Sequence, residues 1–574
     1  MPSWDRSVDF LVVGSGAAGM TAALRAHDLG GETLVVEKSP SYGGSTALSG
    51  GVIWVPDNPL MAPAGIGDSA EEGRRYLEAV TAGSSTTEKL RAYVETAPRM
   101  MTTLAECSHV RFECVESYPD YYAEEAGGKP GGRSCEPAVF DALRLGDEFG
   151  RMGMPDKSDF VLGGRLTVKV AEGKTLMAGG SRVVWFMLRG LFSYYSNLRA
   201  RRKRLGNTDL SLGLALAGRL RLSLMDRKVP LWLDTSLEDL IADEGRIVGA
   251  LVRREGRPLR IQAKKGVLLA AGGFERNLEM RERYQRAPAS DRWTAGCETN
   301  TGDTVAPAVA RGASLDLMDE AWWCPSMLVP FRDASRVMIY EKNLAGGIIV
   351  DRSGRRFMNE AEPYNDVGKS MYRANTSEGQ AIPAFLVFDR RFRRKYSCGP
   401  MMPSAATPDW ALPKVLEGNF FEKSENLDGL ARKIGVDADG LIETVRCFNE
   451  FARTGKDLDF GRGDNLQDRY YTAKAEGPNP SLGPVEEPPF YAVKVYPGDL
   501  GTKGGFRTDA RARILTDSDE VIRGLYAAGN CSSAVMGRTY PGAGGTIGPA
   551  MTFGYIAAEH GLEVRWKKLS ISRA

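Results

Sequence analysis

Short apolar runs alternate with glycine-rich stretches in the first forty positions of the chain. Residues 9–13 (DFLVV) form a compact, mainly apolar run that predicts a buried parallel strand, and residues 20–26 (MTAALRA) have the composition of a helix. A second apolar run at residues 33–37 (TLVVE) predicts another strand. This order predicts a βαβ unit, in which a helix connects two parallel strands.

The turn between the first strand and the helix has the pattern G-x-G-x-x-G. Gly14 permits the tight turn, Gly16 lets a pyrophosphate approach the backbone, and Gly19 lets helix and strand pack closely. The helix N-terminus presents free N–H groups and its positive dipole end to phosphates. Glu37, at the end of the second strand, can accept hydrogen bonds from an adenosine ribose. These features predict a dinucleotide site, and the alternative is a glycine-rich structural turn.

Three further segments favour FAD over NAD as the dinucleotide. Residues 41–51 (SYGGSTALSGG) form a second glycine-rich loop, which FAD proteins use around the pyrophosphate and ribityl chain. Residues 266–273 and 524–530 are apolar strands that end in small residues, and the second adds a polar Asn530. Since the segments are far apart, the FAD domain must be discontinuous. The expected cofactor contacts are Gly14, Ser15, Gly16, Ala17, Ala18, Gly19, Glu37, Lys38, Gly43, Gly44, Ser45, Thr46, Ser49, Gly50, Gly51, Ala271, Gly272, Gly273, Gly529 and Asn530.

Composition restricts the class of protein further. A chain of 574 residues exceeds the size of a single hydrophobic core, so we expect at least two domains. With 43% hydrophobic and 26% charged residues it has ordinary globular composition, which argues against a disordered or fibrous chain. The net charge of +2 gives no basic excess, so we expect no nucleic-acid partner.

The scarcity of histidine and the spacing of cysteine limit the chemistry. There are only three histidines, which nearly excludes a site built from several His ligands. The eight cysteines include no CxxC pair, so we expect reduced thiols and no metal site. The N-terminus has no basic region followed by an apolar stretch, and no run of 18 apolar residues occurs. We therefore expect a cytoplasmic protein.

Five segments carry a resemblance to a known family. They are the loop at Gly43, residues 118–122 (YPDYY), 356–364 (RFMNEAEPY), 498–505 (GDLGTKGG) and 539–549 (TYPGAGGTIGP). These segments resemble the flavoprotein family of fumarate reductases, succinate dehydrogenases and 3-ketosteroid dehydrogenases, and the Δ1-dehydrogenase branch most. The resemblance covers most of the chain.

The resemblance implies an α/β fold, in which a discontinuous, Rossmann-like FAD-binding domain is interrupted by an α+β catalytic domain. We place the FAD-binding domain at residues 1–278 and 487–574 and the catalytic domain at residues 279–486. The proline-rich stretch at 484–489 is the expected return linker. The resemblance also implies cofactor contacts from Asn300, Gly302, Asp303, Gly545, Thr546 and Ile547.

Removal of two hydrogens beside a ketone requires a donor to the carbonyl oxygen, a base for the α-proton and a hydride acceptor. With histidine scarce, tyrosine is the natural base, although a phenol with a pKa near 10 needs help to ionise. The resemblance assigns the O–H of Tyr540 and the N–H of Gly544 to the carbonyl oxygen. It makes Tyr364 the base that removes the C2 proton and Tyr121 its helper. The alternative is a set of buried or turn tyrosines.

An apolar cleft is needed for a steroid substrate. Several apolar residues are candidates for its lining, although core packing is the more frequent explanation for any single one of them: Phe274, Trp322, Trp323, Met327, Leu328 and Ile348.

Residues 183–206 combine an aromatic, apolar stretch with a dense basic run, RARRKR at 199–204. Such a segment is a candidate for peripheral contact with an anionic membrane surface, where rings lie at the interface and charges meet headgroups. A solvated charged helix is the alternative.

Three other functions remain open at this point. A fumarate reductase or succinate dehydrogenase subunit would bind a dicarboxylate through several Arg and His residues. A 3-ketosteroid Δ4-(5α)-dehydrogenase would share fold and cofactor but lack the pair Tyr121 and Tyr364. A flavin-binding protein without turnover need not keep the tyrosines. We expect FAD to be non-covalent, because residues 45–48 (STAL) include no His for attachment. An external electron acceptor is required, with a quinone as the candidate class.

Overall fold

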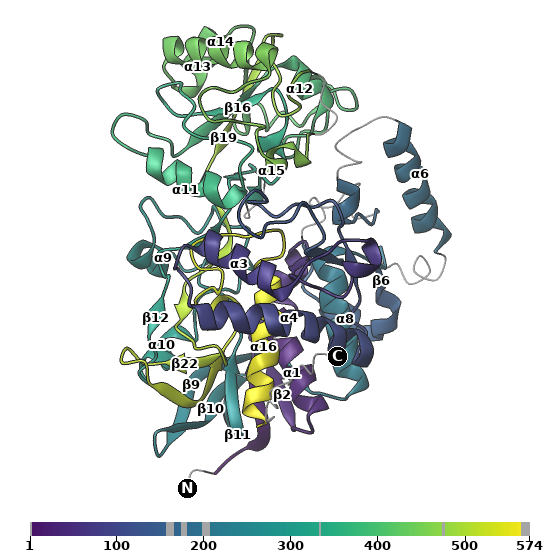
Figure 1. Ribbon diagram of the computed structural model, residues 1–574, viewed down its shortest axis with the longest axis vertical. Helices are drawn as coiled ribbons and strands as arrows, with labels where there is room; N and C mark the ends of the chain where they lie inside the picture. The colour runs from purple at the N-terminus through teal and green to yellow at the C-terminus, as the bar shows by residue number, and fades with distance from the viewer. Residues whose placement is uncertain are drawn as a thin grey trace.

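The computed structural model describes residues 3–155, 166–173, 181–197, 207–331, 335–472 and 477–563. Its largest element is an eight-stranded sheet that contains both strands of the expected βαβ unit (Figure 1). The order is β22-β23-β10-β11-β1-β2-β8, and β9 pairs with β10. The strands are β1 (Arg6–Val13), β2 (Thr33–Val36), β8 (Leu231–Trp232), β9 (Thr235–Asp243), β10 (Arg246–Arg254), β11 (Arg257–Leu269), β22 (Arg513–Leu515) and β23 (Val521–Ala527).

The central strands of this sheet are parallel and end together. β1 pairs in parallel with β2 and β11, and β11 pairs in parallel with β23. The last residues of these strands are aligned: Val13 is opposite both Val36 and Leu269, and Leu269 is opposite Ala527. The four apolar runs predicted to be strands are thereby confirmed. The glycine-rich segments that follow them meet at one edge of the sheet.

Helices cover one face of the sheet. α1 (Ala17–Asp28), α4 (Thr87–Cys107), α8 (Leu212–Asp226) and α16 (Ile547–Gly561) share one core, to which Phe10 and Val12 of β1 contribute (Figure 1). The alternate residues Leu11 and Val13 belong to a second core on the other face. A parallel strand buried on both faces is continuously apolar, which explains the run at residues 9–13. α2 (Gly44–Leu48) packs against α8, and α3 (Ala70–Thr81) against α4.

A second, antiparallel sheet lies at the far end of the molecule from the N-terminus (Figure 1). Its order is β16-β17-β19-β18, and alternate residues of β16 contribute to different cores, Ile348 to one and Ile349 to the other. The strands are β16 (Gly347–Val350), β17 (Ala384–Phe388), β18 (Phe421–Ser424) and β19 (Phe490–Val495). The neighbouring helices are α11 (Tyr364–Ala374), α12 (Arg390–Lys395), α13 (Leu427–Ile434), α14 (Ala438–Thr454) and α15 (Leu466–Tyr470).

The pairing of β19 indicates where the chain leaves the second sheet. β19 pairs with both β17 and β18, although residues 490–495 fall in the range assigned to the FAD-binding domain from sequence. The division at residues 278/279 and 486/487 stays a prediction, and the pairing of β19 favours a return after Val495.

Small strand pairs and short helices complete the described fold. β13 (Ala321–Trp323) pairs with β20 (Asp499–Thr502), which joins a segment before the second sheet to one after it. No helix in the described ranges is long and apolar enough to cross a membrane. The remaining elements are β3 (Ile53–Trp54), β4 (Phe112–Cys114), β5 (Ser134–Pro137), β6 (Phe140–Asp141), β7 (Asp209–Leu210), β12 (Leu315–Asp316), β14 (Ser326–Met327), β15 (Arg336–Val337), β21 (Gly505–Phe506), α6 (Ser181–Ser196), α9 (Leu278–Tyr284) and α10 (Val305–Val309).

Candidate functional site

A cavity of about 1200 Å³ opens where the parallel strands end. One part of its wall, which we call the glycine half, comes from residues 13–18, 36–38, 44–46, 48–52, 270–272, 299–300, 303–304, 529–530 and 546–547. The other part, the tyrosine half, contains Tyr118, Tyr121, Tyr364, Tyr471 and Tyr540, with apolar side chains that include Val329, Phe331, Val337, Ile339, Tyr396 and Met402. One cavity therefore joins the expected cofactor loops to the expected catalytic tyrosines.

The first glycine loop is held by close backbone packing. Gly14 has φ +108°, and a Cβ on it would lie 2.3 Å from the carbonyl oxygen of Ala270. Only glycine fits such a position. A Cβ on Gly19 would lie 2.0 Å from the carbonyl oxygen of Gly14, in keeping with close packing of helix on strand. The N–H of Ala17, the first residue of α1, donates to Thr46 Oγ1 at 2.9 Å and so ties the two glycine-rich loops together.

Glu37 holds the first loop in place and also faces the cavity. Its Oε2 accepts from the N–H of Ser15 at 2.9 Å and from its hydroxyl at 2.7 Å, while Oε1 accepts from the N–H of Ser39 at 3.0 Å. Ser15 Oγ in turn accepts from the N–H of Gly43 at 3.1 Å. A carboxylate has about four acceptor positions, so Glu37 retains capacity for a ribose.

A polar cluster borders the glycine half. Asn300 Nδ2 donates to Ser45 Oγ at 3.0 Å and to Glu275 Oε1 at 2.7 Å. Lys38 Nζ donates to Thr301 Oγ1 at 2.6 Å and forms an ion pair with Asp303. Burial raises the pKa of the Glu275 carboxyl to about 7. Glu275 was not predicted from the sequence, although it lies two residues after the pair Gly272–Gly273 that follows β11.

Most of the residues expected to contact the cofactor line the cavity, and five do not. These five glycines pack against neighbouring backbone or side-chain atoms inside the wall or beside it: Gly19, Gly43, Gly273, Gly302 and Gly545. The lining residues are Gly14, Ser15, Gly16, Ala17, Ala18, Glu37, Lys38, Gly44, Ser45, Thr46, Ser49, Gly50, Gly51, Ala271, Gly272, Asn300, Asp303, Gly529, Asn530, Thr546 and Ile547.

This half of the cavity fits FAD. The N-termini of α1 and α16 both reach it, through Ala17 and Ala18 and through Thr546 and Ile547, and helix N-termini favour anionic groups. Glycines leave the backbone accessible where a pyrophosphate must approach it. No cluster of His, Cys, Asp and Glu that could hold a metal ion occurs among the described residues.

Three tyrosines from distant segments meet in the tyrosine half. Tyr121 lies in a loop, Tyr364 is the first residue of α11, and Tyr540 precedes α16. The ring centroids are 5.6 Å apart for Tyr121 and Tyr364, 5.5 Å for Tyr121 and Tyr540, and 5.3 Å for Tyr364 and Tyr540. Tyr118, whose hydroxyl lies 2.5 Å from that of Tyr471, also packs against Tyr121. All three predicted tyrosines are buried.

Burial sets the ionisation of these phenols. Desolvation raises the pKa of Tyr121 and Tyr364 well above the usual value and also raises the pKa of Tyr540. Hydrogen bonding between Tyr121 and Tyr364 has opposite effects on the pair: it lowers the pKa of Tyr364 and raises that of Tyr121. Between these two phenols a negative charge is therefore favoured on Tyr364, and a hydrogen bond from Tyr364 in turn lowers the pKa of Tyr540.

Tyr540 and Gly544 are held close together by the turn before α16. The hydroxyl of Tyr540 accepts from Thr546 Oγ1 at 3.2 Å, and the backbone N–H of Gly544 acts on the same phenol and lowers its pKa. Gly544 has φ +100°, and a Cβ there would lie 2.4 Å from the carbonyl carbon of Ile53. Glycine is thus required at this position. A phenol O–H and a backbone N–H on one side of the cavity can stabilise a developing oxyanion.

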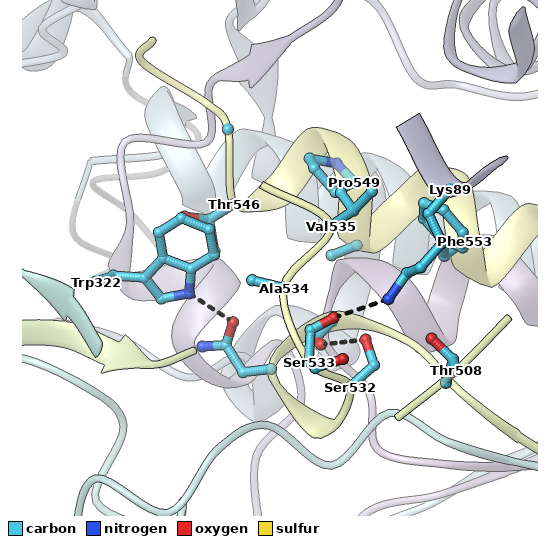
Figure 2. Close-up of a pocket in the computed structure, with 14 residues that line it drawn as sticks. Lys89, Trp322, Thr508, Ser532, Ser533, Ala534, Val535, Thr546, Pro549 and Phe553 are labelled. Atoms are coloured by element: carbon cyan, nitrogen blue, oxygen red, sulfur yellow. Dashed lines mark hydrogen bonds between the residues drawn. The ribbon is translucent and has the colours of Figure 1, made fainter. Parts of the chain in front are cut away.

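Trp322 does not line the cavity but contacts a residue of each half, Asn530 in the glycine half and Tyr540 in the tyrosine half. Its indole N–H donates to Asn530 Oδ1 at 3.0 Å, beside a separate small pocket of about 20 Å³ (Figure 2). Its ring meets that of Tyr540 edge-on, with centroids 5.0 Å apart. Figure 2 also shows Lys89 in that pocket, where Nζ donates to the carbonyl oxygen of Ser533 at 3.3 Å.

The apolar residues proposed from sequence for the substrate cleft lie elsewhere. None of the six lines the cavity, and Phe274, Trp323, Met327 and Ile348 are buried in the protein interior. The observed apolar lining was not predicted, because its residues are scattered over loops, α6 and β15 and give no common periodic signal: Leu166, Val168, Met187, Val329, Phe331, Val337, Ile339, Tyr396 and Met402.

Similarity to known proteins agrees with this geometry. A family model described as "FAD binding domain" matches residues 9–547. The chain is 44% identical to the 3-oxosteroid 1-dehydrogenase of Mycolicibacterium smegmatis and 36% identical to that of Comamonas testosteroni, over 96% of each chain. A crystal structure of 3-ketosteroid Δ1-dehydrogenase from Sterolibacterium denitrificans in complex with 1,4-androstadiene-3,17-dione superimposes with a TM-score of 0.94 at 45% identity, covering 98% of this chain and 100% of that one. The expected α/β flavoprotein fold, FAD as cofactor and the resemblance are confirmed. The chain belongs to the FAD-binding domain family and, within it, to the 3-oxosteroid 1-dehydrogenases.

Proposed function

We propose that this FAD-dependent oxidoreductase introduces a double bond between C1 and C2 of the A-ring of 3-ketosteroids. The observation that carries the proposal is the meeting of Tyr121, Tyr364 and Tyr540 in a cavity that the FAD loops also line. The names of the relatives, which act on 3-oxosteroids, support the same substrate class.

Tyr540 and Gly544 bind the C3 oxygen. The phenol is buried with a raised pKa, so its O–H stays protonated and can donate. The N–H of Gly544 supplies the second donor. Two donors placed before the reaction begins make the neighbouring C2 proton more acidic, because they stabilise the enolate more than the ketone.

Tyr364 removes the C2 proton. Its hydroxyl lies in the same cluster as that of Tyr540, so base and carbonyl donor reach adjacent atoms of one ring. Tyr121 supports the ionised form of Tyr364 by hydrogen bonding, and the Tyr118–Tyr471 pair lies on its far side. The proton taken from C2 therefore stays within a group of phenols.

FAD, when bound, supplies flavin N5 as the acceptor for the C1 hydride. Residues of the glycine half, with Glu37 and Asn300 among them, hold it. We propose non-covalent attachment, because residues 45–48 offer no His side chain. Turnover also requires an external electron acceptor, for which we propose a quinone.

We propose domain limits that keep the first sheet in the FAD-binding domain and the second sheet in the catalytic domain. The FAD-binding domain takes residues 1–278 and the C-terminal segment, and the catalytic domain begins at residue 279. We place the return after Val495, because β19 still pairs within the second sheet, beyond the proline-rich stretch at 484–489.

We further propose peripheral contact with an anionic membrane surface through α6. Four large side chains of this helix are exposed: Trp185, Leu188, Phe192 and Tyr195 have 57% to 76% of their surface accessible. Met187 of the same helix lines the cavity, so the exposed face lies beside a wall of the substrate site. The basic run at 199–204 lies outside the described residues. An amphipathic helix of this kind binds at the headgroup boundary.

Two other functions are less compatible with the cavity. A dicarboxylate site of that kind uses several Arg and His side chains, whereas the described cavity wall contains one arginine, Arg336, and none of the three histidines. A Δ4-(5α)-dehydrogenase would not need the Tyr121–Tyr364 pair, which this chain has. We therefore place Δ1-desaturation first and Δ4-desaturation second.

An anaerobic titration of the yellow holoenzyme with 4-androstene-3,17-dione tests the proposal. We expect bleaching of the oxidised-flavin absorption band and formation of the 1,4-diene in equal amount. A flavin-loaded enzyme that is not bleached would contradict it. Oxidation of a saturated 5α-steroid ketone to the 4-ene, in preference to the 1-ene, would favour the Δ4 alternative.

A further inference from the structure

A buried lysine joins the chain segments that carry two of the active-site tyrosines. Lys503 lies in the turn between β20 and β21 and is fully buried. Its Nζ donates to the carbonyl oxygen of Thr539 at 2.7 Å and to Asn365 Oδ1 at 3.2 Å. Thr539 directly precedes Tyr540, and Asn365 directly follows Tyr364.

Trp322 extends this contact toward Tyr540 and the glycine half. Nζ of Lys503 lies 4.5 Å from the centroid of the indole ring. The same ring meets Tyr540 edge-on. Its N–H, shown in Figure 2, donates to Asn530. β13, which carries Trp322, pairs with β20, and this pairing brings Trp322 close to Lys503.

Tyr121 is connected to the same hydrogen-bond network through its neighbour Tyr122. Tyr122, next to Tyr121, donates its hydroxyl to Asp366 Oδ2 at 2.7 Å and accepts from Thr539 Oγ1 at 3.4 Å. Each of the three tyrosines is therefore adjacent in sequence to a member of one polar network.

We propose that Lys503 is a positioning residue that holds Tyr364 and Tyr540 at the separation needed to act on C2 and on the C3 oxygen together. This inference rests on the proposed function. A buried lysine is costly unless hydrogen bonds compensate for lost hydration, and here the partners are the neighbours of both tyrosines. The charged groups around it are mixed: Glu320 and Asp366 oppose Lys369 and Arg538.

The two tyrosines must act in one step on adjacent atoms, so their separation matters. A displacement of about 1 Å can slow a reaction by about 100-fold. Loss of Lys503 removes one partner from each tyrosine segment and leaves the phenols themselves intact. Proton removal at C2 should then slow, while steroid binding, which depends mainly on the apolar wall, changes little.

The test compares Lys503→Met with Lys89→Met in the holoenzyme. Lys89 is the matched control: it is another buried lysine, and within the described part of the chain its Nζ donates one hydrogen bond, to the carbonyl oxygen of Ser533. We expect Lys503→Met to lower kcat by about 10- to 100-fold with KM changed less than about 3-fold. The kinetic isotope effect from C2-deuterated steroid should rise and that from C1-deuterated steroid should fall. Lys89→Met should stay within about twofold of the wild type.

Hydrogen exchange of peptides 364–374 and 536–546 gives a readout that needs no turnover. Both peptides should exchange faster in Lys503→Met and not in Lys89→Met. Asn365→Ala removes one arm of the contact and serves if Lys503→Met does not fold; it should show the same isotope pattern at smaller size. Unchanged kcat, an unchanged C2 isotope effect or unchanged exchange in a flavin-loaded variant would overturn the inference. If the wild type fails to oxidise the steroid, the proposed function fails, and exchange at the two peptides still decides the role of Lys503.

Discussion

The two halves of the cavity are built in different ways. The glycine half is made mainly of backbone: glycines in positive-φ turns, two helix N-termini and a carboxylate that holds its own loop. The tyrosine half is made of side chains, and its key residues 121, 364 and 540 belong to no common sheet or helix. A charged dinucleotide is bound by backbone dipoles, whereas a neutral ketone is activated by buried phenols.

The halves also differ in solvation. Lys38, Glu37 and Asp303 keep the glycine half polar, while the phenols of the tyrosine half are desolvated enough to raise their pKa values. Substitutions in the tyrosine half should therefore slow the reaction while FAD stays bound. Substitutions in the glycine half should weaken FAD binding while the reaction rate at saturating FAD is retained.

The largest effect is expected for Tyr364→Phe. Loss of the general base should lower kcat by about 10²- to 10⁴-fold. FAD content should equal that of the wild type, because Tyr364 is outside the glycine half. Steady-state turnover and the flavin-to-protein absorbance ratio measure the two. Activity within about threefold of the wild type would remove Tyr364 from the mechanism.

Tyr540→Phe should have the next largest effect. It removes one of two donors to the C3 oxygen, and the loss of such a donor costs about 10²- to 10³-fold in kcat. Tyr526→Phe is the control, because Tyr526 lies in β23 and hydrogen-bonds His560 outside the cavity. Equal losses in both variants would attribute the effect to general packing.

Glu37→Ala tests FAD binding by the glycine half. Hydrogen bonds to a charged group contribute about 1.5–3 kcal/mol, which corresponds to a 10- to 100-fold rise in the Kd of FAD. At saturating FAD, kcat should stay within about twofold of the wild type. Equilibrium titration of the apoprotein by flavin fluorescence gives Kd. A variant that binds FAD normally would leave Glu37 with only its contacts to Ser15 and Ser39.

The pH dependence of kcat/KM tests the tyrosine half. Tyr364 must be ionised to accept a proton, and burial places its pKa well above the usual value. Below that pKa the ionised fraction rises up to tenfold for each unit of pH, so kcat/KM should rise from neutral into alkaline solution. Initial rates across this range check it, with Tyr364→Phe expected to lose the slope. A flat wild-type profile would contradict ionisation of Tyr364 as the step observed.

The smallest effect on chemistry is expected outside both halves. Trp185→Ser combined with Phe192→Ser removes exposed rings from α6 and should reduce pelleting with phosphatidylserine-containing vesicles by a few-fold. Bleaching by a soluble steroid should stay unchanged. Trp410→Ser is the control, because Trp410 is 87% exposed on another element. Pelleting equal to that of the wild type would argue against α6 as the contact.

The glycine half could be predicted to a large extent because its signals are local. Strand, glycine turn and helix follow one another within thirty residues, and parallel pairing brings the later loops to the same edge. The exceptions show the limit of such reasoning. Gly273 and Gly302 have packing roles away from the cavity, and a glycine needed for packing has the same letter as one needed for a ligand.

The substrate wall could not be predicted in this way. Trp323 and Met327 are apolar and clustered, as a cleft residue would be, yet they lie in the core. Phe331 and Met402, which do line the cavity, come from separate loops. Residue type indicates that a side chain leaves water but not which apolar surface receives it.

Hydrophobic periodicity, together with glycine where backbone must pass closely, is enough to identify the βαβ unit and the FAD loops from local segments. The three tyrosines were identified through the resemblance of short segments to a known family. The folded structure adds that the ring centroids of these tyrosines lie within 6 Å of one another, that Glu275 accepts a hydrogen bond from Asn300 and that Lys503 joins Thr539 to Asn365. The physical reason is distance along the chain: such contacts join residues up to hundreds of positions apart, and local patterns contain no record of them.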